Sequence, residues 1–396
     1  MLPRFSKLLP GVLAALLAGT AADAAEQKLF SLTDVKGDDD GSGVLIFPNR
    51  PDMQQGDLDL VRVSAENWSD GVWFVVEMQQ LIRSPEGLVT ELGQSPISNI
   101  AREGFYTFNV DIYVDTDRIA GSGHTRAIPG RGVTIDRNFA WEKCIVLTPR
   151  PGVAQTMLQI EFDKEFEAEL RAKQGKVSKD ELNELQGRSE MRVNDLYFFP
   201  TKVRVSARTV EFFVPSEFLG GLPSTKWGYT ALVTGADLDQ SGRSGQITPP
   251  RPTMFTLPVA QGISFSMFGI RSDTDRATPP VADILAIDPD VQARVLTNYD
   301  SVAGRLAAIP GMTPDGNVAV APSGEVLTAE EAAQIESTTG AAAAGGAAAG
   351  GAAPTTGGAE KRTVPARLRT LNQLLADGLI TEAEYNELRR KILAEL

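Results

Sequence analysis

The sequence contains one cysteine, Cys144, and one histidine, His124. A single cysteine excludes an internal disulfide framework, and its strand-like apolar surroundings predict a buried thiol that packs as a small hydrophobic group. A single histidine excludes zinc sites built from several histidines, and any Ser-His-Asp triad would depend on it. His124 lies in the turn-like segment Gly-Ser-Gly-His-Thr, so we expect a surface-loop histidine and no enzyme. Hydrolysis by two carboxylates and haem binding are remote alternatives.

Positive charge is also scarce, because 38 Lys and Arg stand against 51 Asp and Glu, which gives a formal net charge of −13 at pH 7. Such a surface repels phosphate backbones, so nucleic acid is not an expected partner. Long apolar runs are missing too. After the first 24 residues no run approaches the roughly 18 apolar residues that a membrane span needs, so we expect none in the mature protein.

The N-terminus has the pattern of a secretory signal peptide. Arg4 and Lys7 precede an apolar run at residues 8–17, and Ala22 and Ala24 supply the small residues that a signal peptidase accepts. We therefore expect residues 1–24 to be removed and the mature protein to be exported, to the periplasm or to the extracellular cell surface.

Residues 25–290 show short strands separated by Gly, Pro, Asn and Asp, a pattern typical of an antiparallel β-sandwich. Residues 108–115 alternate between apolar and polar side chains, which predicts a strand with one buried face and one face in water. Further strands are expected at residues 58–63, 72–78, 203–207, 210–214 and 227–233.

Two regions depart from this pattern. Residues 164–190 are charged and favour helix, and Ser178 followed by Glu181 predicts a capping box, so we expect a solvent-facing helical insertion. Residues 291–363 form a tail and linker whose Ala/Gly-rich run at 340–358 is too poor in large apolar residues to order itself.

Six motifs in the first 290 residues occur in an order that resembles a known family. They are Gly-Asp-Asp-Asp-Gly-Ser-Gly at 37–43 with Phe47-Pro48, Gly-Asp-Leu-Asp-Leu at 56–60, Val-Asp-Ile-Tyr-Val-Asp-Thr at 110–116, Gly-Ser-Gly-His-Thr at 121–125, Pro-Gly-Arg at 129–131 and Trp-Glu at 141–142. With the tail at 280–285, they resemble the C-terminal domain of glucodextranase, a DOMON-like β-sandwich, over about residues 29–288. The resemblance implies a noncatalytic binding or surface-attachment module with carbohydrate as its ligand.

Carboxylates in Gly-rich turns suggest calcium, which takes 6 to 8 oxygen ligands on a flexible backbone. The alternative is that Asp and Gly simply form turns. Three candidate clusters are present: Asp38, Asp39 and Asp40 with Asp57; Asp111, Asp115 and Asp117; and Asp237, Asp239 and Ser241.

Aromatic side chains that face outward would provide stacking surfaces for sugar rings. Trp73 alternates with Val75 and Glu77, Tyr113 shares the polar side of its strand, and Trp68 lies at a turn. These three residues are the candidate ligand-binding residues. We expect the other two tryptophans, Trp141 and Trp227, to pack in the interior.

Residues 364–396 predict two amphipathic helices and resemble the short C-terminal domain (SHOCT) found at the ends of bacterial proteins. The resemblance implies oligomerisation or docking onto a partner protein. The apolar stripe that would form this interface contains Leu371, Leu374, Tyr385, Leu388 and Ile392. We therefore expect a homo-oligomeric binding module for carbohydrate or an envelope polymer; a structural surface or assembly protein is the alternative.

Overall fold

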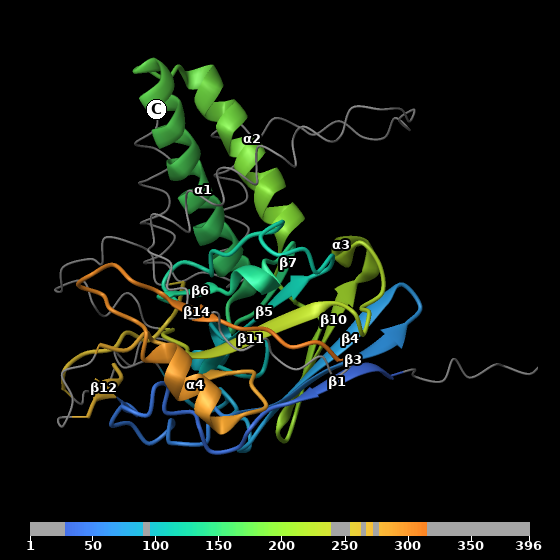
Figure 1. Cartoon of the computed structure of the whole chain (residues 1–396), viewed down its shortest axis with the longest axis vertical. Coiled ribbons are helices and arrows are strands. Elements are labelled where there is room, and N and C mark those ends of the chain that lie inside the picture. The colour runs from blue at the N-terminus through green and yellow to red at the C-terminus, as the bar shows by residue number, and fades with distance from the viewer. Residues whose placement is uncertain (1–27, 90–95, 239–253, 263–266, 272–276, 315–396) are drawn as a thin grey trace, which may run out of the picture.

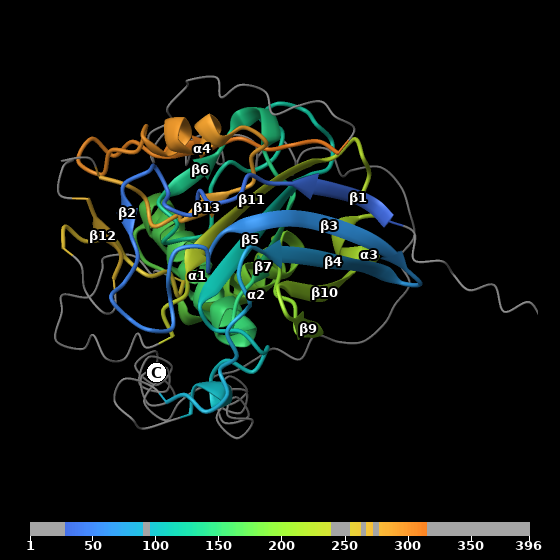
Figure 2. The ribbon, with the colours of Figure 1, turned by 90° about the horizontal axis from the view of Figure 1, so that it is seen from below.

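A computed structural model describes residues 28–89, 96–238, 254–262, 267–271 and 277–314. Two five-stranded sheets form the centre of the described region (Figures 1 and 2). The first sheet runs in the order β1 (Lys28–Thr33), β3 (Leu60–Trp68), β4 (Gly71–Met78), β10 (Thr209–Pro215) and β9 (Val203–Ser206). The second runs in the order β13 (Asp283–Ile284), β11 (Gly228–Gly235), β5 (Phe108–Asp115), β7 (Lys143–Leu147) and β8 (Tyr197–Phe198).

The pairs within both sheets are antiparallel except β7 with β8, which is parallel. Two small sheets join distant segments: β2 (Leu45–Ile46) with β12 (Gly269–Ile270), and β6 (Val133–Ile135) with β14 (Ala307–Ile309). The helices are α1 (Pro151–Gln174), α2 (Lys179–Leu196), α3 (Ser216–Leu219) and α4 (Pro289–Leu296), with 3-10 turns η1 (Ile97–Asn99) and η2 (Arg137–Phe139).

The two large sheets pack face to face around one apolar core, as the alternating strands predict. Phe74 of β4 stacks on Phe212 of β10 with ring centroids 5.7 Å apart, and both side chains are fully buried. Val110 and Ile112 of β5 reach the same core from the second sheet. Burial of each large apolar side chain stabilises the folded state by about 1.5 to 3 kcal/mol, so this core holds the two sheets together.

The second sheet is also covered on its other face, and this differs from the sequence prediction. Asp111, Tyr113 and Asp115 were expected on a wet face of β5, but all three are buried. A second apolar core lies there, formed with the base of α1 and α2 and with α4. The polar pattern of β5 therefore marks side chains that have partners inside the protein, not side chains in water.

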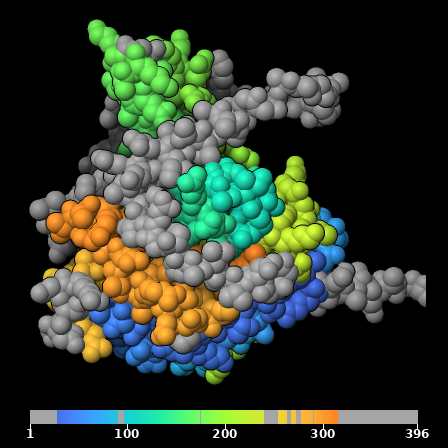
Figure 3. Space-filling model, in the orientation of Figure 1, coloured from blue at the N-terminus to red at the C-terminus, as the bar shows by residue number. Residues whose placement is uncertain are grey.

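The predicted helical insertion is present but longer than 164–190. Helix α1 begins at Pro151, and α2 ends at Leu196. Ser178 caps α2 through the predicted capping box with Glu181. The hairpin connects β7 to its parallel neighbour β8, and it projects well beyond the sandwich (Figures 1 and 3). Parallel strands require a crossover connection, and this hairpin supplies it.

The packed region continues beyond residue 290, because Val295 and Leu296 of α4 and Ile309 of β14 are buried in the second core. The expected signal peptide at 1–24, the part of the expected tail and linker (291–363) that follows residue 314, and the C-terminal hairpin at 364–396 lie outside the described residues. No helix in the described ranges is both long and apolar enough to cross a membrane.

Candidate functional site

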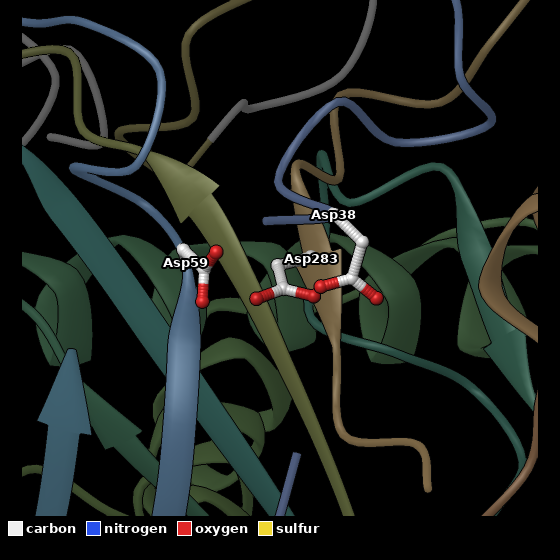
Figure 4. A group of neighbouring side chains, drawn as sticks. All are labelled: Asp38, Asp59 and Asp283. Atoms are coloured by element: carbon white, nitrogen blue, oxygen red, sulfur yellow. The ribbon is translucent and has the colours of Figure 1, made fainter. Parts of the chain in front are cut away.

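Three carboxylates from distant segments meet at one edge of the sandwich (Figure 4). Asp38 lies in the loop after β1, Asp59 directly precedes β3, and Asp283 begins β13. Each offers one oxygen, and these oxygens lie within 4.8 Å of one another. Asp283 stands opposite Val233, a residue of the core between the sheets, so its side chain faces the first sheet.

Hydrogen bonds hold two of these carboxylates by one oxygen only. The Leu60 backbone N–H donates to Asp283 Oδ2 at 2.6 Å, and the Gly37 N–H donates to Asp59 Oδ2. Oδ1 of Asp59, Oδ1 of Asp283 and both oxygens of Asp38 are buried without a hydrogen-bond partner among the described residues. Asp59 and Asp283 have no exposed surface.

The electrostatics of this group follow from its burial. Burial, reinforced by the charge of Asp59, raises the pKa of Asp38 to about 6, and burial raises the pKa of Asp59 to about 6. Burial followed by the charge of Asp34 raises the pKa of Asp283 well above its ordinary value. Removal from water disfavours an ionised carboxylate unless a cation or hydrogen-bond donors compensate it.

Two further carboxylates border the group. Asp34 accepts hydrogen bonds at Oδ1 from the backbone N–H groups of Val35 and Ala286, while its Oδ2 is buried without a partner in the described chain. Burial raises its pKa to about 9. Asp39 accepts at Oδ2 from Gly56 N–H at 2.7 Å, its Oδ1 has no partner in the same residues, and burial raises its pKa to about 7.

The first predicted cluster is thus only partly assembled. Asp38 joins the group of three, Asp39 lies beside it, and Asp57 forms an ion pair with Arg83 at 3.0 Å. Asp40 is half-buried and does not join. The sequence did not identify Asp59 and Asp283 as members of this group. The signal available was an acidic residue flanked by Leu58 and Leu60 at the start of an apolar strand.

The second predicted cluster does not form a single site. Asp111 is paired with Arg131, whose guanidinium Nε lies 2.6 Å from Oδ2, and both side chains are buried. Asp115 pairs with Arg118 at 2.8 Å. Asp115 and Asp117 instead lie near Glu142, so that one oxygen of each falls within 4.8 Å of the others.

Of the third cluster, the structure describes only Asp237, which is buried at the end of β11; Asp239 and Ser241 lie outside the described residues.

The three candidate aromatic residues have different environments. Tyr113, expected to face outward, is fully buried: its hydroxyl accepts from Ile128 N–H at 2.9 Å and its ring lies against Trp141. Trp73 lies on the outer side of β4, as predicted, and is half-buried. Trp68 is 48% exposed at the end of β3.

Cys144 is fully buried, as predicted, and burial raises the pKa of its thiol well above the ordinary value. His124 differs from the expected surface-loop residue. It is half-buried against the Trp141 ring at 5.0 Å, and its Nε2 lies 3.2 Å from Arg192 Nη2 of α2. It lines a small hollow at the base of the α1–α2 hairpin. Its contacts are those of a residue that fixes the hairpin to the sandwich.

Comparisons with known proteins agree with the resemblance. A family model described as the C-terminal binding module, SLH-like, of glucodextranase matches residues 29–311. A second model, of the short C-terminal domain, matches residues 366–393. No curated protein matches the chain. The first match covers every strand of the described residues apart from Lys28, the first residue of β1, and it ends just after β14. This family model describes the binding module and not the catalytic part of glucodextranase. The chain belongs to the family of glucodextranase C-terminal binding modules and carries a short C-terminal domain.

Proposed function

We propose that the chain is a noncatalytic module that binds carbohydrate or an envelope polysaccharide on the outer face of the first sheet. Membership in a binding-module family supports binding as the function. The signal-like N-terminus and the extracellular setting of glucodextranase-type modules support export to the periplasm or the cell surface. The observation that carries the proposal is the position of Trp73 on the outer side of β4, where its side chain is partly exposed.

Trp73 lies at the centre of a mixed aromatic and polar surface. Phe213 of β10 stands opposite it in the register, with ring centroids 5.9 Å apart, and Glu66 of β3 stands opposite on the other side. The Arg204 guanidinium lies over the Trp73 ring at 4.4 Å. Strand alternation places Trp68 on the same face. Figure 2 shows the strands of this sheet side by side.

This arrangement has the chemistry that sugar recognition needs. An aromatic ring offers a flat apolar surface for one side of a pyranose, while charged side chains around it bond the hydroxyl groups. Glu66 accepts and Arg204 donates hydrogen bonds. The Arg204 side chain is 68% exposed and forms only a long ion pair with Glu211 at 3.8 Å, so it can turn off the ring and bond a sugar that stacks there.

The match to a short C-terminal domain supports a second part of the proposal, that residues 364–396 join copies of the chain or dock onto a partner protein. Several weak sugar sites held in one assembly bind a polymer more tightly than a single site does.

The test is binding of the full-length protein to insoluble and soluble polysaccharides, including dextran and peptidoglycan, by pull-down and affinity electrophoresis. Trp73→Ala should weaken binding about thirtyfold, since loss of a stacking anchor costs about 2 kcal/mol. Ile119→Ala is the matched control, because Ile119 is 61% exposed and remote from this sheet face in sequence.

Two further arms separate the alternatives. Deletion of residues 364–396 should leave single-site affinity unchanged while reducing the mass measured by light scattering. Equal binding by Trp73→Ala and the wild type would disprove the proposed surface. Release of sugar by the wild type, abolished in His124→Ala, would disprove the noncatalytic role.

A further inference from the structure

The acidic group at Asp38, Asp59 and Asp283 has no role in the proposed sugar surface. We propose that these three residues form a binding site for one Ca²⁺ ion, which links the loop after β1, the start of β3 and the start of β13. The proposal stands independently of the sugar proposal, because the two use different residues.

The spacing of the oxygens suits a single ion. Calcium binds oxygens at about 2.3 to 2.6 Å, so two ligands on opposite sides of one ion lie roughly 4.6 to 5.2 Å apart, and adjacent ligands lie closer. One oxygen each from Asp38, Asp59 and Asp283 fits within 4.8 Å. The three carboxylates therefore already have the separation that a shared cation would impose.

The unpartnered oxygens supply the second and independent reason. Oδ1 of Asp59 and Oδ1 of Asp283 belong to side chains with no exposed surface, and neither has a hydrogen-bond donor among the described residues. Among the described residues, no Lys or Arg forms an ion pair with Asp38, Asp59 or Asp283. Buried polar atoms are normally satisfied, so oxygens left open in one direction point to a ligand there.

The composition of the group favours calcium over other metals. All the ligand atoms are hard carboxylate oxygens, whereas zinc and copper sites use histidine or cysteine. Oδ2 of Asp34 and Oδ1 of Asp39 are also buried without a partner in the described residues, so more oxygens lie next to the group. Magnesium prefers few protein ligands and keeps several waters, while calcium accepts a cage built mainly from protein oxygens.

A cation here would fasten the two sheets of the sandwich to each other. Asp59 adjoins β3 of the first sheet, and Asp283 belongs to β13 of the second. The Leu60 N–H already bonds Asp283 Oδ2, so the backbone of one sheet meets a side chain of the other at this place. The ion would replace repulsion among three carboxylates by attraction to a common centre.

The experiment uses the full-length protein, freed of metal with EDTA and dialysed, and titrates it with CaCl₂ by isothermal titration calorimetry. We expect one site per chain. Free calcium at a hundredfold excess over Kd should raise the melting temperature by about 5 to 10 °C. Asp59→Asn and Asp283→Asn should abolish both the heat and the shift, and Asp38→Asn serves if either fails to fold. Asp70→Asn, at an exposed turn, is the matched control and should bind as the wild type does.

Absence of heat and of a melting shift at millimolar calcium would overturn the proposal. Calcium binding that persists in Asp59→Asn and Asp283→Asn would overturn the assignment to these residues. Magnesium binding at the same site with equal or greater affinity would overturn the assignment to calcium.

Discussion

Asp111 and Asp283 lie on opposite faces of the same sheet, two strands apart, and both are fully buried. Asp111 faces the helical layer, where the Arg131 guanidinium binds both of its oxygens at 2.6 and 3.0 Å. Asp283 faces the other sheet, where Asp38, Asp59 and Asp34 surround it. The fold therefore compensates one buried carboxylate with a built-in cation and gathers further carboxyl groups around the other.

The difference shows that burial alone does not distinguish a structural carboxylate from a ligand. Asp111 and Arg131 form a closed unit, because Arg131 also donates to the Met254 carbonyl at 3.0 Å and to Thr256. One oxygen of Asp283 accepts from a backbone donor, and the other has no hydrogen-bond partner among the described residues. This second oxygen is what distinguishes the environment of Asp283 from that of Asp111.

The largest effect in this comparison should come from removing the built-in cation. Arg131→Met leaves the Asp111 charge buried without its guanidinium, which should destabilise the domain by about 3 to 5 kcal/mol. Urea unfolding followed by tryptophan fluorescence measures the change. The double variant Asp111→Leu/Arg131→Met should recover most of the loss, since it removes both charges. A single variant as stable as the wild type would show that the pair does not hold this layer.

A smaller effect of opposite sign is expected at Asp283. Without a bound cation, the buried Asp283 carboxyl costs free energy at neutral pH, because its raised pKa makes the folded state hold a proton that the unfolded state releases. In EDTA, Asp283→Asn removes this cost, so the variant should be more stable than the wild type by about 1 kcal/mol. Asn retains an oxygen that accepts from Leu60 N–H. Asp111→Asn should destabilise under the same conditions, because it strands Arg131. If both substitutions shift the urea midpoint in the same direction, the two sites do not differ as described.

The smallest effect should appear at Glu142, which lies near Asp115 and Asp117. Burial, reinforced by the charges of Asp117 and Asp115, raises the pKa of Glu142 to about 7. A raised carboxyl pKa contributes stability below the unfolded pKa, and that contribution is lost as pH rises through 7. Glu142→Gln mimics the protonated form. Its free energy of unfolding should therefore exceed that of the wild type by almost nothing at pH 5 and by a difference that grows with pH but stays below about 1 kcal/mol at pH 8.

Urea midpoints in EDTA at the two pH values measure this change, and exposed Glu86→Gln is the control. A Glu142→Gln advantage that is already present at pH 5, or that shrinks at pH 8, would contradict the assignment. The effect is small because Arg118 pairs with Asp115 and offsets part of the local charge.

Local features of the fold could be predicted from the sequence because their causes are local. The capping box of Ser178 and Glu181 spans four residues, and the structure contains it. The strand at 108–115 has the predicted bounds, since alternation within one segment defines them. The burial of its polar face could not be predicted, because it depends on α1 and α2, which return to the sheet through the crossover between β7 and β8.

The candidate site was only partly predictable for the same reason. The Gly-rich acidic loop at 37–43 is visible as a local motif, and it supplies Asp38. Asp59 and Asp283 look like isolated acidic residues among apolar neighbours, and only the pairing of β13 with β11 brings Asp283 to the group. On the outer side of the first sheet, alternation correctly placed Trp73 outward, whereas the same rule misplaced Tyr113 because both sides of β5 are covered.

The contact between Leu60 and Asp283 joins positions 223 residues apart in the chain. Closing so long a loop is slow and comes after local strand pairing, so this edge of the sandwich is among the last parts to assemble. A chain that has emerged only as far as β11 can pair β3 with β4 but lacks the third carboxylate. Affinity for a divalent ion at this edge would therefore appear only when β13 has been added, and would distinguish a chain that includes β13 from one that ends or has emerged only before it.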